Sequence, residues 1–323
     1  MPVEMFAFTP TEGRGVVGAL GEGLLEVGLD PGMPPDALGR GFGGDAANAT
    51  VMAARMGARA RLITRVGDDA AGRLLLAHWR EQGVELDAVS VDAIASTGIY
   101  INERGVDGAH RFSYHRLGSA ASALSDEDAG EAALDALSVL HITGITLSIS
   151  EAAARAAEVA AARARAQGAA VAFAVNFRAS LGPDRERLLA FARTADVLFL
   201  SVEDARSLLG AERLDDVVAA LGRRPAEIVM THGAEQAVVL AGGVRHALVP
   251  PPVVAIDAAG AGDAVAGAYL AMRSAGQPPE RALAYGVVAG TLSCRAAGCS
   301  RSYPSAMEVE SAVQALDGRV TAA

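Results

Sequence analysis

Asp257-Ala258-Ala259-Gly260-Ala261-Gly262-Asp263 is a turn of small residues that ends in an aspartate, and a helix-like run to Tyr269 follows it. Small residues let a backbone approach a ligand closely, and the free N–H groups at a helix start favour an anion. The stretch therefore predicts a phosphate site, with Asp263 accepting the proton of an attacking hydroxyl. Taken alone, the same residues also fit an ordinary loop-to-helix junction with Asp263 as a first-turn acid. For an isolated glycine-rich turn we prefer that interpretation.

The chain contains no lysine, because all 28 of its Lys and Arg residues are arginine. Walker-type Gly-Lys loops, lysine-dependent protein kinases, Schiff-base enzymes and pyridoxal-phosphate enzymes are excluded, since each needs a lysine ammonium. Any phosphate chemistry must rely on backbone dipoles, arginine or a metal ion. We attribute the deficit itself to codon bias, since alanine and glycine are abundant.

Composition and charge predict a globular protein of the cytoplasm. The 323 residues are 51% hydrophobic and carry a formal net charge of -10, which argues against nucleic acid or an anionic membrane as partner. We expect no signal segment and no membrane span, since no uncharged run approaches the roughly 18 residues that a span needs. Cys294 and Cys299 are too few for a disulfide scaffold, and we expect them to be reduced and structural.

From residue 138 onward, short apolar runs alternate with amphipathic helical patterns, which is typical of βαβ units around a mostly parallel sheet. An alanine-rich helix is expected between an N-cap at Ser150 and a stop at Gly168. Strands are expected at 138–143, 170–175, 197–200, 228–231 and 237–240, and further helices at 202–209, 214–221, 264–274 and 280–295.

The segments 21–44 and 97–117 carry glycine, proline and strand-like alternation without helices. They flank a helix expected at 45–57 and a strand expected at 61–66. We expect the two segments to form one small sheet, an excursion from a single domain that spans residues 1–323. A sheet over the mouth of an α/β domain would be a lid that excludes water during group transfer.

Three motifs occur in order: Gly-Gly-Asp-Ala-Ala-Asn at 43–48, Val-Gly-Asp-Asp-Ala-Ala-Gly at 66–72, and the turn at 257–263. Together they resemble the ribokinase-type (PfkB family) sugar kinases, from about residue 21 to the last helix. The resemblance implies a three-layer αβα ribokinase-like domain, a mostly parallel central sheet, a small β-sheet lid, ATP as donor and Mg²⁺ as helper. It also implies that Asp263 is the general base and that the amides of Gly260, Ala261 and Gly262 form the anion hole.

Finer matches at 97–100, 112–124 and 175–178 resemble the 2-keto-3-deoxygluconate kinases. This resemblance implies a sugar site lined by Gly43, Gly44, Asn48, Tyr100, Tyr114, Arg116 and Arg178. A sugar acid accounts for the two arginines, since a planar guanidinium suits a carboxylate best. Taken singly, the tyrosines also fit as lid aromatics and the arginines as surface charges.

On the nucleotide side, the resemblance implies contacts from Ser201, Thr231 and Gly233, together with Gly260 and Gly262. Ser201 and Asp204 stand where the family usually has the ends of Asn-x-x-Glu, a motif linked to Mg²⁺ through water. Asp204 or Glu203 can still order hydrated Mg²⁺. The alternative, which we prefer, is a helix N-cap at Ser201 followed by first-turn acids.

The expected reaction is in-line transfer of the ATP γ-phosphoryl group to the terminal hydroxyl of 2-keto-3-deoxygluconate, with Arg116 and Arg178 holding the far carboxylate. Alternatives are a fructokinase- or ribokinase-like enzyme and a catalytically silent sugar-binding relative. A dinucleotide oxidoreductase fits poorly, because 41–44 lacks the strand-to-helix Gly-x-Gly-x-x-Gly turn. The sequence does not distinguish gluconate from galactonate epimers. Because a lid sheet with an exposed face often packs on a partner, we expect a homodimer.

Overall fold

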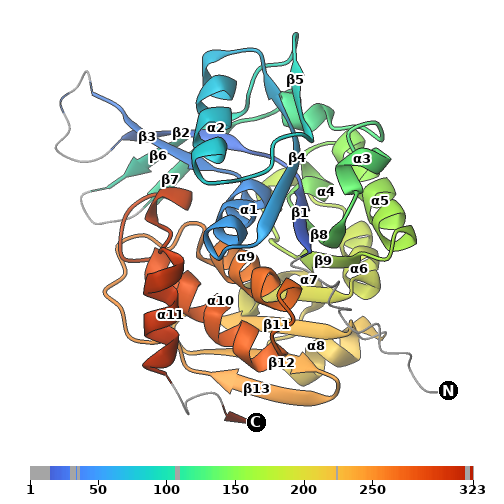
Figure 1. The fold of residues 1–323 in the computed structure, drawn as a ribbon, viewed down its shortest axis with the longest axis vertical. Coiled ribbons are helices and arrows are strands. Elements are labelled where there is room, and N and C mark those ends of the chain that lie inside the picture. Colours follow the sequence, from blue (N-terminus) through green and yellow to red (C-terminus); the bar gives the residue numbers. More distant parts are fainter. Residues whose placement is uncertain are drawn as a thin grey trace.

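A ten-stranded sheet crosses the molecule in the order β14-β13-β12-β11-β10-β9-β8-β1-β4-β5 (Figure 1). The computed structural model describes residues 15–29, 34, 37–105, 110–222, 225–316 and 321–322. Neighbours from β11 through β5 run parallel, and β12, β13 and β14 add an antiparallel edge. The strands are β1 Val16–Leu20, β4 Arg59–Gly67, β5 Val89–Asp92, β8 Leu137–Thr143, β9 Ala170–Ala174, β10 Val197–Ser201, β11 Glu227–His232, β12 Gln236–Ala241, β13 Val244–Leu248 and β14 Thr321–Ala322.

Helices cover both faces of this sheet, because each strand sends alternate side chains to opposite faces. In β1, Val17 and Ala19 join the core beneath α1, α2, α9 and α10, whereas Val16 and Leu20 join the core beneath α5 to α8. The helices are α1 Asp45–Arg55, α2 Ala70–Glu81, α3 Glu131–Leu134, α4 Thr146–Ile149, α5 Glu151–Ala166, α6 Arg185–Thr194, α7 Val202–Leu209, α8 Leu214–Leu221, α9 Ala261–Ser274, α10 Pro279–Ser293 and α11 Ala306–Gln314, with short 3-10 segments η1 Ala120–Ala123, η2 Ala179–Leu181 and η3 Ser300–Ser302.

A second sheet of four strands, in the order β3-β2-β6-β7, projects from one side of the large sheet (Figure 1). Its strands are β2 Leu24–Leu29, β3 Gly39–Gly43, β6 Ile99–Arg104 and β7 His110–His115. β2 runs parallel to β6, and the other pairs are antiparallel. Within the two segments predicted to form a lid, residues 30–33, 35–36 and 106–109 lie outside the described residues.

The fold class predicted from the sequence is confirmed: three layers around a mostly parallel sheet, with a small second sheet. The alanine-rich helix begins as expected, since the Ser150 hydroxyl accepts the Ala153 N–H at 2.9 Å. The helix predicted at 45–57 ends earlier, at Arg55, and the patterns did not predict β1 or α2. No helix in the described ranges combines the length and the apolar character that a membrane span requires.

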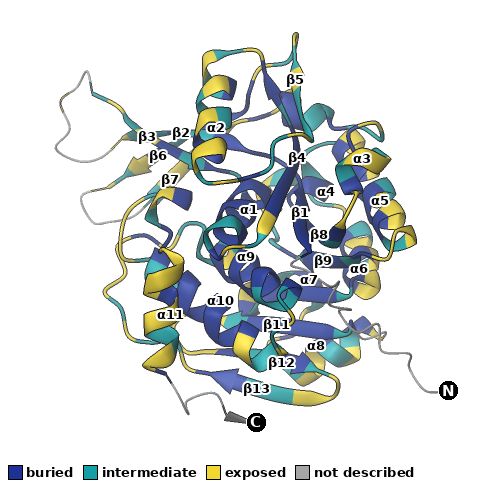
Figure 2. Cartoon of the chain, viewed as in Figure 1, coloured by how far each residue is buried: buried dark blue, intermediate teal, exposed yellow. Residues whose placement is uncertain are grey.

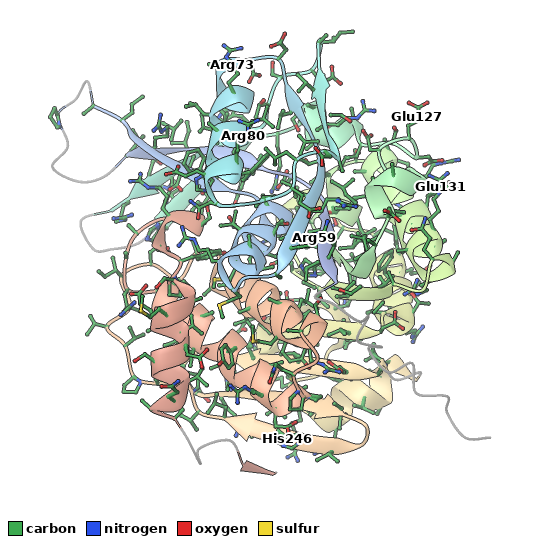
Figure 3. The ribbon with its side chains drawn as sticks, in the orientation of Figure 1. Arg59, Arg73, Arg80, Glu127, Glu131 and His246 are labelled. Carbon is green, nitrogen blue, oxygen red and sulfur yellow. The ribbon has the colours of Figure 1, made fainter. Side chains whose placement is uncertain are left out.

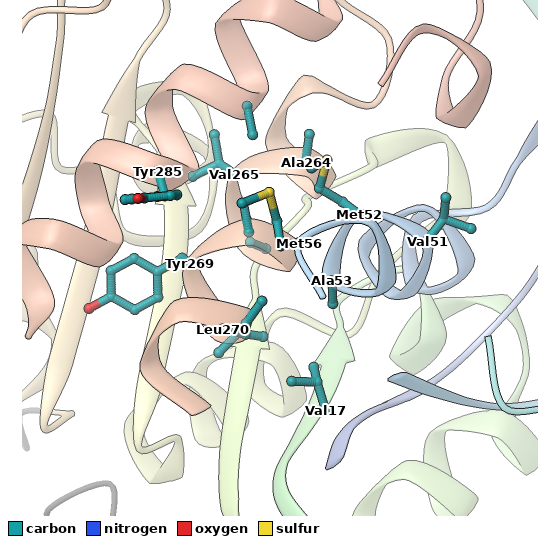
Figure 4. Packing of buried hydrophobic residues seen from close by; sticks show 14 of the residues in the cluster. Val17, Val51, Met52, Ala53, Met56, Ala264, Val265, Tyr269, Leu270 and Tyr285 are labelled. Atoms are coloured by element: carbon teal, nitrogen blue, oxygen red, sulfur yellow. The ribbon is translucent and has the colours of Figure 1, made fainter. Parts of the chain in front are cut away.

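Helices α1 and α9 pack closely, and both are buried along most of their length (Figure 2). Met52 of α1 and Met56, the residue that caps its C-terminal end, lie beside Ala264 and Val265 of α9 (Figure 4). Gly267 permits this approach, because a methyl group there would overlap the carbonyl oxygen of Ala49. The contact holds the N-terminal ends of the two helices side by side. Asp263 lies in the first turn of α9, and Asn48 lies near the start of α1.

Candidate active site

A cavity of ≈ 1220 Å³ opens at the carboxyl ends of the parallel strands, between the two sheets. Ligands of open α/β sheets bind at this edge, because the chain leaves each strand there into a loop. Of the residues predicted for the site, the cavity wall includes Gly44, Asn48, Tyr100, Tyr114, Arg116, Arg178, Ser201, Asp204, Thr231, Gly233, Gly260, Ala261, Gly262 and Asp263. Gly43 is outside the wall, but its Cα lies against the Tyr100 ring, and a Cβ there would come within 2.7 Å of it.

Asp263 sits in the first turn of α9, partly buried in the cavity wall. Its Oδ2 accepts a hydrogen bond from the Asn48 side-chain amide of α1 at 2.9 Å. Burial, and after it the Asp45 carboxylate, raises the pKa of the Asp263 carboxyl to about 7, against the opposing effects of the Asn48 amide and the Arg178 guanidinium. The group is thus poised to take up or release a proton near neutral pH.

The backbone of the turn before α9 is held by the turn's own Asp257 side chain and by Tyr303 from a later segment. The Asp257 carboxylate accepts the N–H groups of Ala259 at 2.9 Å and Gly298 at 3.0 Å, and the Tyr303 hydroxyl donates to the Gly260 carbonyl at 2.8 Å. The Ala261 amide already donates to the Ala258 carbonyl at 3.2 Å, so it is less free than the sequence suggested.

Three amides of this turn remain available for an anion. The N–H groups of Gly260, Gly262 and Asp263 make no hydrogen bond to any part of the chain that the structure describes. They lie at the positive end of the α9 dipole, which favours a bound anion.

Glycine is required where the chain enters α1. Gly44 has φ 94°, and a Cβ there would overlap the carbonyl of Glu22. The turn brings Asp45 into the cavity, where its Oδ2 accepts the side-chain amide of Asn176 at 3.0 Å. Asn176 itself has φ 41°, a left-handed conformation that asparagine tolerates better than most residues.

Arg116 lies beneath the small sheet in a buried ion pair with Glu22, and its guanidinium stacks 4.2 Å from the centre of the Tyr114 ring. Burial raises the pKa of Glu22 to about 7, although Arg116 opposes the rise. Glu22 Oε2 and Arg116 Nε are buried without a partner among the described residues. The positive charge that the sequence assigned to a substrate carboxylate is therefore already matched by an internal acid.

Arg178 follows β9 and is exposed in the cavity wall. It donates to the side-chain oxygen of Asn176 at 2.8 Å and to the Phe177 carbonyl at 3.0 Å, both of them neutral acceptors. No carboxylate in the described ranges forms an ion pair with it, so its charge is available to a ligand.

The start of α7 is the helix N-cap that the sequence favoured at Ser201. Ser201 is the N-cap, and it exchanges hydrogen bonds with Asp204 in a capping box. Both Asp204 oxygens accept backbone N–H groups, from Phe177 at 2.8 Å and Ser201 at 3.0 Å. The neighbouring Glu203 is exposed in the cavity wall, and its carboxylate accepts no hydrogen bond from a described residue.

The far end of the cavity is mostly apolar. Val229, Ala237 and Val287 contribute to its walls, and so does the proline-rich segment 250–253. Thr231 and Gly233 stand at its edge, and Thr231 pairs with Ser201 across β10 and β11. An apolar slot beside polar strand ends suits a ligand with a flat hydrophobic ring and a polar tail.

A model of the pfkB family carbohydrate kinases matches residues 27–306 of this chain. The chain belongs to the pfkB family. It is 34% identical over 322 residues to a 2-dehydro-3-deoxygluconokinase from Thermoproteus tenax, a match that covers 95% of this chain and 97% of that protein. A fructokinase-1 from Oryza sativa subsp. japonica is 30% identical over 282 residues, covering 83% and 86%. A crystal structure of a fructokinase from Xylella fastidiosa with bound ATP has a TM-score of 0.84 at 25% identity, covering 94% of this chain and 99% of that one.

The family predicted from the motifs is thus confirmed, and the protein is a carbohydrate kinase. Sequence reasoning missed Glu22 and Asp45 as members of the cavity wall, whereas it had named Glu203 as a possible partner of hydrated Mg²⁺. Asp45 lies inside the motif at 43–48, but the motif alone indicated no role for it. Nothing in the sequence signalled Glu22 as a partner of Arg116, because 94 residues separate them.

Proposed function

We propose that this pfkB family kinase transfers the γ-phosphoryl group of ATP to the terminal hydroxyl of 2-keto-3-deoxygluconate (2-dehydro-3-deoxygluconate), giving the 6-phosphate. The observation that carries this choice is the exposed Arg178 guanidinium, which lacks a carboxylate partner among the described residues and lowers the pKa of nearby Asp263. A neutral sugar has no need of this cation, whereas a sugar acid does. The identity to the Thermoproteus tenax enzyme also supports the choice.

In this proposal Asp263 accepts the proton of the attacking hydroxyl, and Asn48 orients it. A base with a pKa near 7 combines a useful ionised fraction with a strong pull on the proton. The amides of Gly260 and Gly262, with that of Asp263, stabilise charge on the transferring phosphoryl group. The Ala261 amide contributes less, because it is already hydrogen-bonded.

On the sugar side, Arg178 holds the carboxylate. The Glu22–Arg116 pair serves hydroxyl groups, since Glu22 Oε2 can accept and Arg116 Nε can donate a hydrogen bond that neither makes within the described residues. Tyr100 and Tyr114 supply aromatic walls, and Gly43 and Gly44 keep the entry to α1 narrow enough for close approach. The small sheet closes over this part of the cavity as a lid.

ATP fits the other end, with its ring in the apolar slot near Val287 and its phosphates toward Thr231, Gly233 and the α9 turn. The Xylella fastidiosa relative holds ATP. Mg²⁺ commonly keeps several waters and uses one or two carboxylates plus substrate phosphates, a donor set that Glu203 and Asp204 fit. Glu203 is the better ligand, because both Asp204 oxygens accept backbone bonds. When bound, the ion supplies charge neutralisation at the phosphates.

A sugar panel tests the proposal: 2-keto-3-deoxygluconate, its galactonate epimer, fructose and ribose with ATP and Mg²⁺, read out as ADP release. We expect kcat/KM for a keto-deoxy acid to exceed that for either neutral sugar at least about 100-fold, because a neutral sugar leaves Arg178 unpaired. The position of the new phosphate, read by ³¹P NMR, should be the terminal carbon.

Preference for fructose or ribose would make this chain a neutral-sugar kinase, in line with the similarity to fructokinase-1, and would reject the acid substrate. Sugar binding without ADP release from any sugar would indicate a silent relative and reject the assignment of Asp263 as base.

A further inference from the structure

A second cavity, of ≈ 260 Å³, lies where β3 of the small sheet meets α1, α2 and η3. It shares no residue with the wall of the large cavity. At ~30 Å³ per water its volume corresponds to roughly nine water molecules, enough for a small hydrated anion. Its wall is formed by Arg40, Phe42, Arg55, His78, Glu81, Gln82 and Arg301.

Three arginines line this small space. Arg40, Arg55 and Arg301 form no ion pair with a carboxylate of the described residues, although most other arginines in those ranges do. Their fixed bonds go to neutral acceptors: Arg55 donates to the Gln82 side chain at 2.8 Å and to the Tyr303 carbonyl, and Arg301 donates to the Arg40 carbonyl. Most of the N–H groups of these three guanidinium groups have no hydrogen-bond partner among the described residues.

The only acid in the described wall, Glu81, is exposed, so the wall carries an excess of positive charge in a protein whose net charge is -10. This positive charge also acts on His78. The centres of the His78 and Phe42 rings are 3.9 Å apart in a stacked pair, and His78 Nε2 lies 3.1 Å from the Ser300 hydroxyl oxygen. Burial, together with the charges of Arg55 and Arg301, lowers the pKa of His78 to about 4, so its ring is neutral at pH 7. Burial also lowers the pKa of Arg55 itself, while Tyr303 and the Glu308 carboxylate oppose the shift.

We propose that this cavity is a second anion site, which binds a small phosphate-bearing anion between Arg40, Arg55 and Arg301. A planar guanidinium group binds two phosphate oxygens at once, and an anion here would pair with cations that form no ion pair within the described residues. The neutral His78 can donate a further hydrogen bond or accept one from a protonated phosphate.

Such a ligand would also tie the small sheet to the rest of the molecule. Arg40 belongs to β3, Arg55 to α1, and Arg301 to η3, which already contacts β3 through the Ser300 hydroxyl and the Phe42 carbonyl at 3.4 Å. A bound anion would bridge these three elements, so it should raise the melting temperature of the protein.

The test titrates inorganic phosphate by calorimetry while a non-hydrolysable ATP analogue saturates the large cavity, because that cavity also offers anion-binding amides. We expect one remaining phosphate site. Arg40→Gln and Arg301→Gln should each weaken it about tenfold, the value of one charge-assisted hydrogen bond, and the double variant should abolish it.

Arg80→Gln is the matched control, since Arg80 is exposed on α2, outside the cavity wall (Figure 3). It should bind phosphate as the wild type does, and all variants should bind the ATP analogue unchanged. Glycerol 3-phosphate in place of phosphate distinguishes the two sources of the anion: tighter binding indicates a phosphate monoester, and weaker binding indicates free phosphate.

Absence of a phosphate site in the presence of the analogue would overturn the proposal. So would binding that Arg40→Gln and Arg301→Gln leave unchanged, or that Arg80→Gln weakens equally. A crystal grown with phosphate, showing density between the three guanidinium groups, provides a check that is independent of the variants.

Discussion

Asp263 combines two properties that oppose each other: it lies beside amides that favour an anion, and its burial disfavours its own charge. The Asn48 bond and the nearby Arg178 partly offset the burial, which leaves the group able to ionise near neutral pH. A carboxylate with no reactive role would gain stability by moving into solvent, so its position is best explained by chemistry.

Asp263→Asn should lower kcat by about 10²- to 10⁴-fold, the usual contribution of a general base, while KM for the sugar stays within about threefold. Steady-state ADP release and sugar binding by calorimetry measure the two effects. Asp135→Asn, at an exposed aspartate next to α3, is the matched control and should leave both unchanged. Near-normal turnover in Asp263→Asn would show that another group is the base.

The same substitution should stabilise the protein at high pH. The folded pKa of Asp263 is raised to about 7 from 3.8, so the folded state retains a proton that the unfolded state has lost between these values. The wild type therefore loses stability as pH rises through this window, and the amide variant does not. We expect Asp263→Asn to melt a few degrees higher at pH 8, on the order of 2 kcal/mol, with no difference at pH 4. An equal difference at both pH values would argue against the raised pKa.

Substitution of Arg178 should affect substrate binding, whereas substitution of Arg116 should affect stability. Arg178→Gln should raise KM for the sugar acid about 10- to 100-fold and leave the melting temperature unchanged, because its partners are neutral acceptors at the surface. Arg116→Gln should instead destabilise the fold by about 3 kcal/mol, since it strands the buried Glu22. Glu22→Gln combined with Arg116→Gln should recover much of that stability. Kinetics and thermal melts on the same preparations decide whether Arg178 is the carboxylate ligand.

At the scale of elements, the hydrogen bond between Asn48 and Asp263 depends on two helices, α1 and α9, lying unusually close together. Gly267 of α9 lies against the Ala49 carbonyl and the Met52 side chain of α1, and the absence of a side chain at Gly267 lets the two backbones come together. The separation of two helices thus sets the geometry of the proposed base.

Gly267→Ala should test this dependence, because its methyl group would overlap the Ala49 carbonyl. We expect a loss of about 1–3 kcal/mol in the free energy of unfolding and a lower kcat, since α1 must move away from Asp263. Gly262→Ala on the same helix is the control for stability, since a Cβ there has nothing within 4 Å. If Gly267→Ala melts like Gly262→Ala, the close approach is not what positions Asn48.

At the scale of the whole molecule, the small sheet presents apolar side chains to solvent. Leu117, just beyond β7, is 98% exposed, whereas Tyr114 and Phe112 of β7, which are 47% and 38% exposed, also line the large cavity. β7 is also the last strand in the described order of its sheet. An exposed edge with large apolar side chains is a frequent site of association.

We propose that the protein forms a homodimer through this sheet and that residues 1–323 fold as a single domain with the sheet as its lid. Light scattering after gel filtration should give twice the monomer mass. Leu117→Arg should shift the protein to monomer with little loss of stability, because the side chain is almost fully exposed. A monomeric wild type, or a dimer indifferent to Leu117→Arg, would contradict this interface.

Much of the architecture followed from local patterns alone. The helices predicted at 202–209 and 214–221 match α7 and α8, because their apolar periodicity is interrupted on both sides by capping or glycine residues. β1 was missed, since five buried residues without polar alternation carry little local signal. The capping box at Ser201 was recognisable because it is formed within four consecutive residues.

The sequence by itself determined the family, the layered fold and the residue types of the turn proposed for phosphoryl transfer, because these depend on short motifs and on periodicity within single elements. Only the tertiary structure decided that Glu22 neutralises Arg116, that Asn48 holds Asp263 and that three arginines meet beside β3. Those pairings join residues far apart in the chain, and their electrostatics depend on burial, which no local pattern reports.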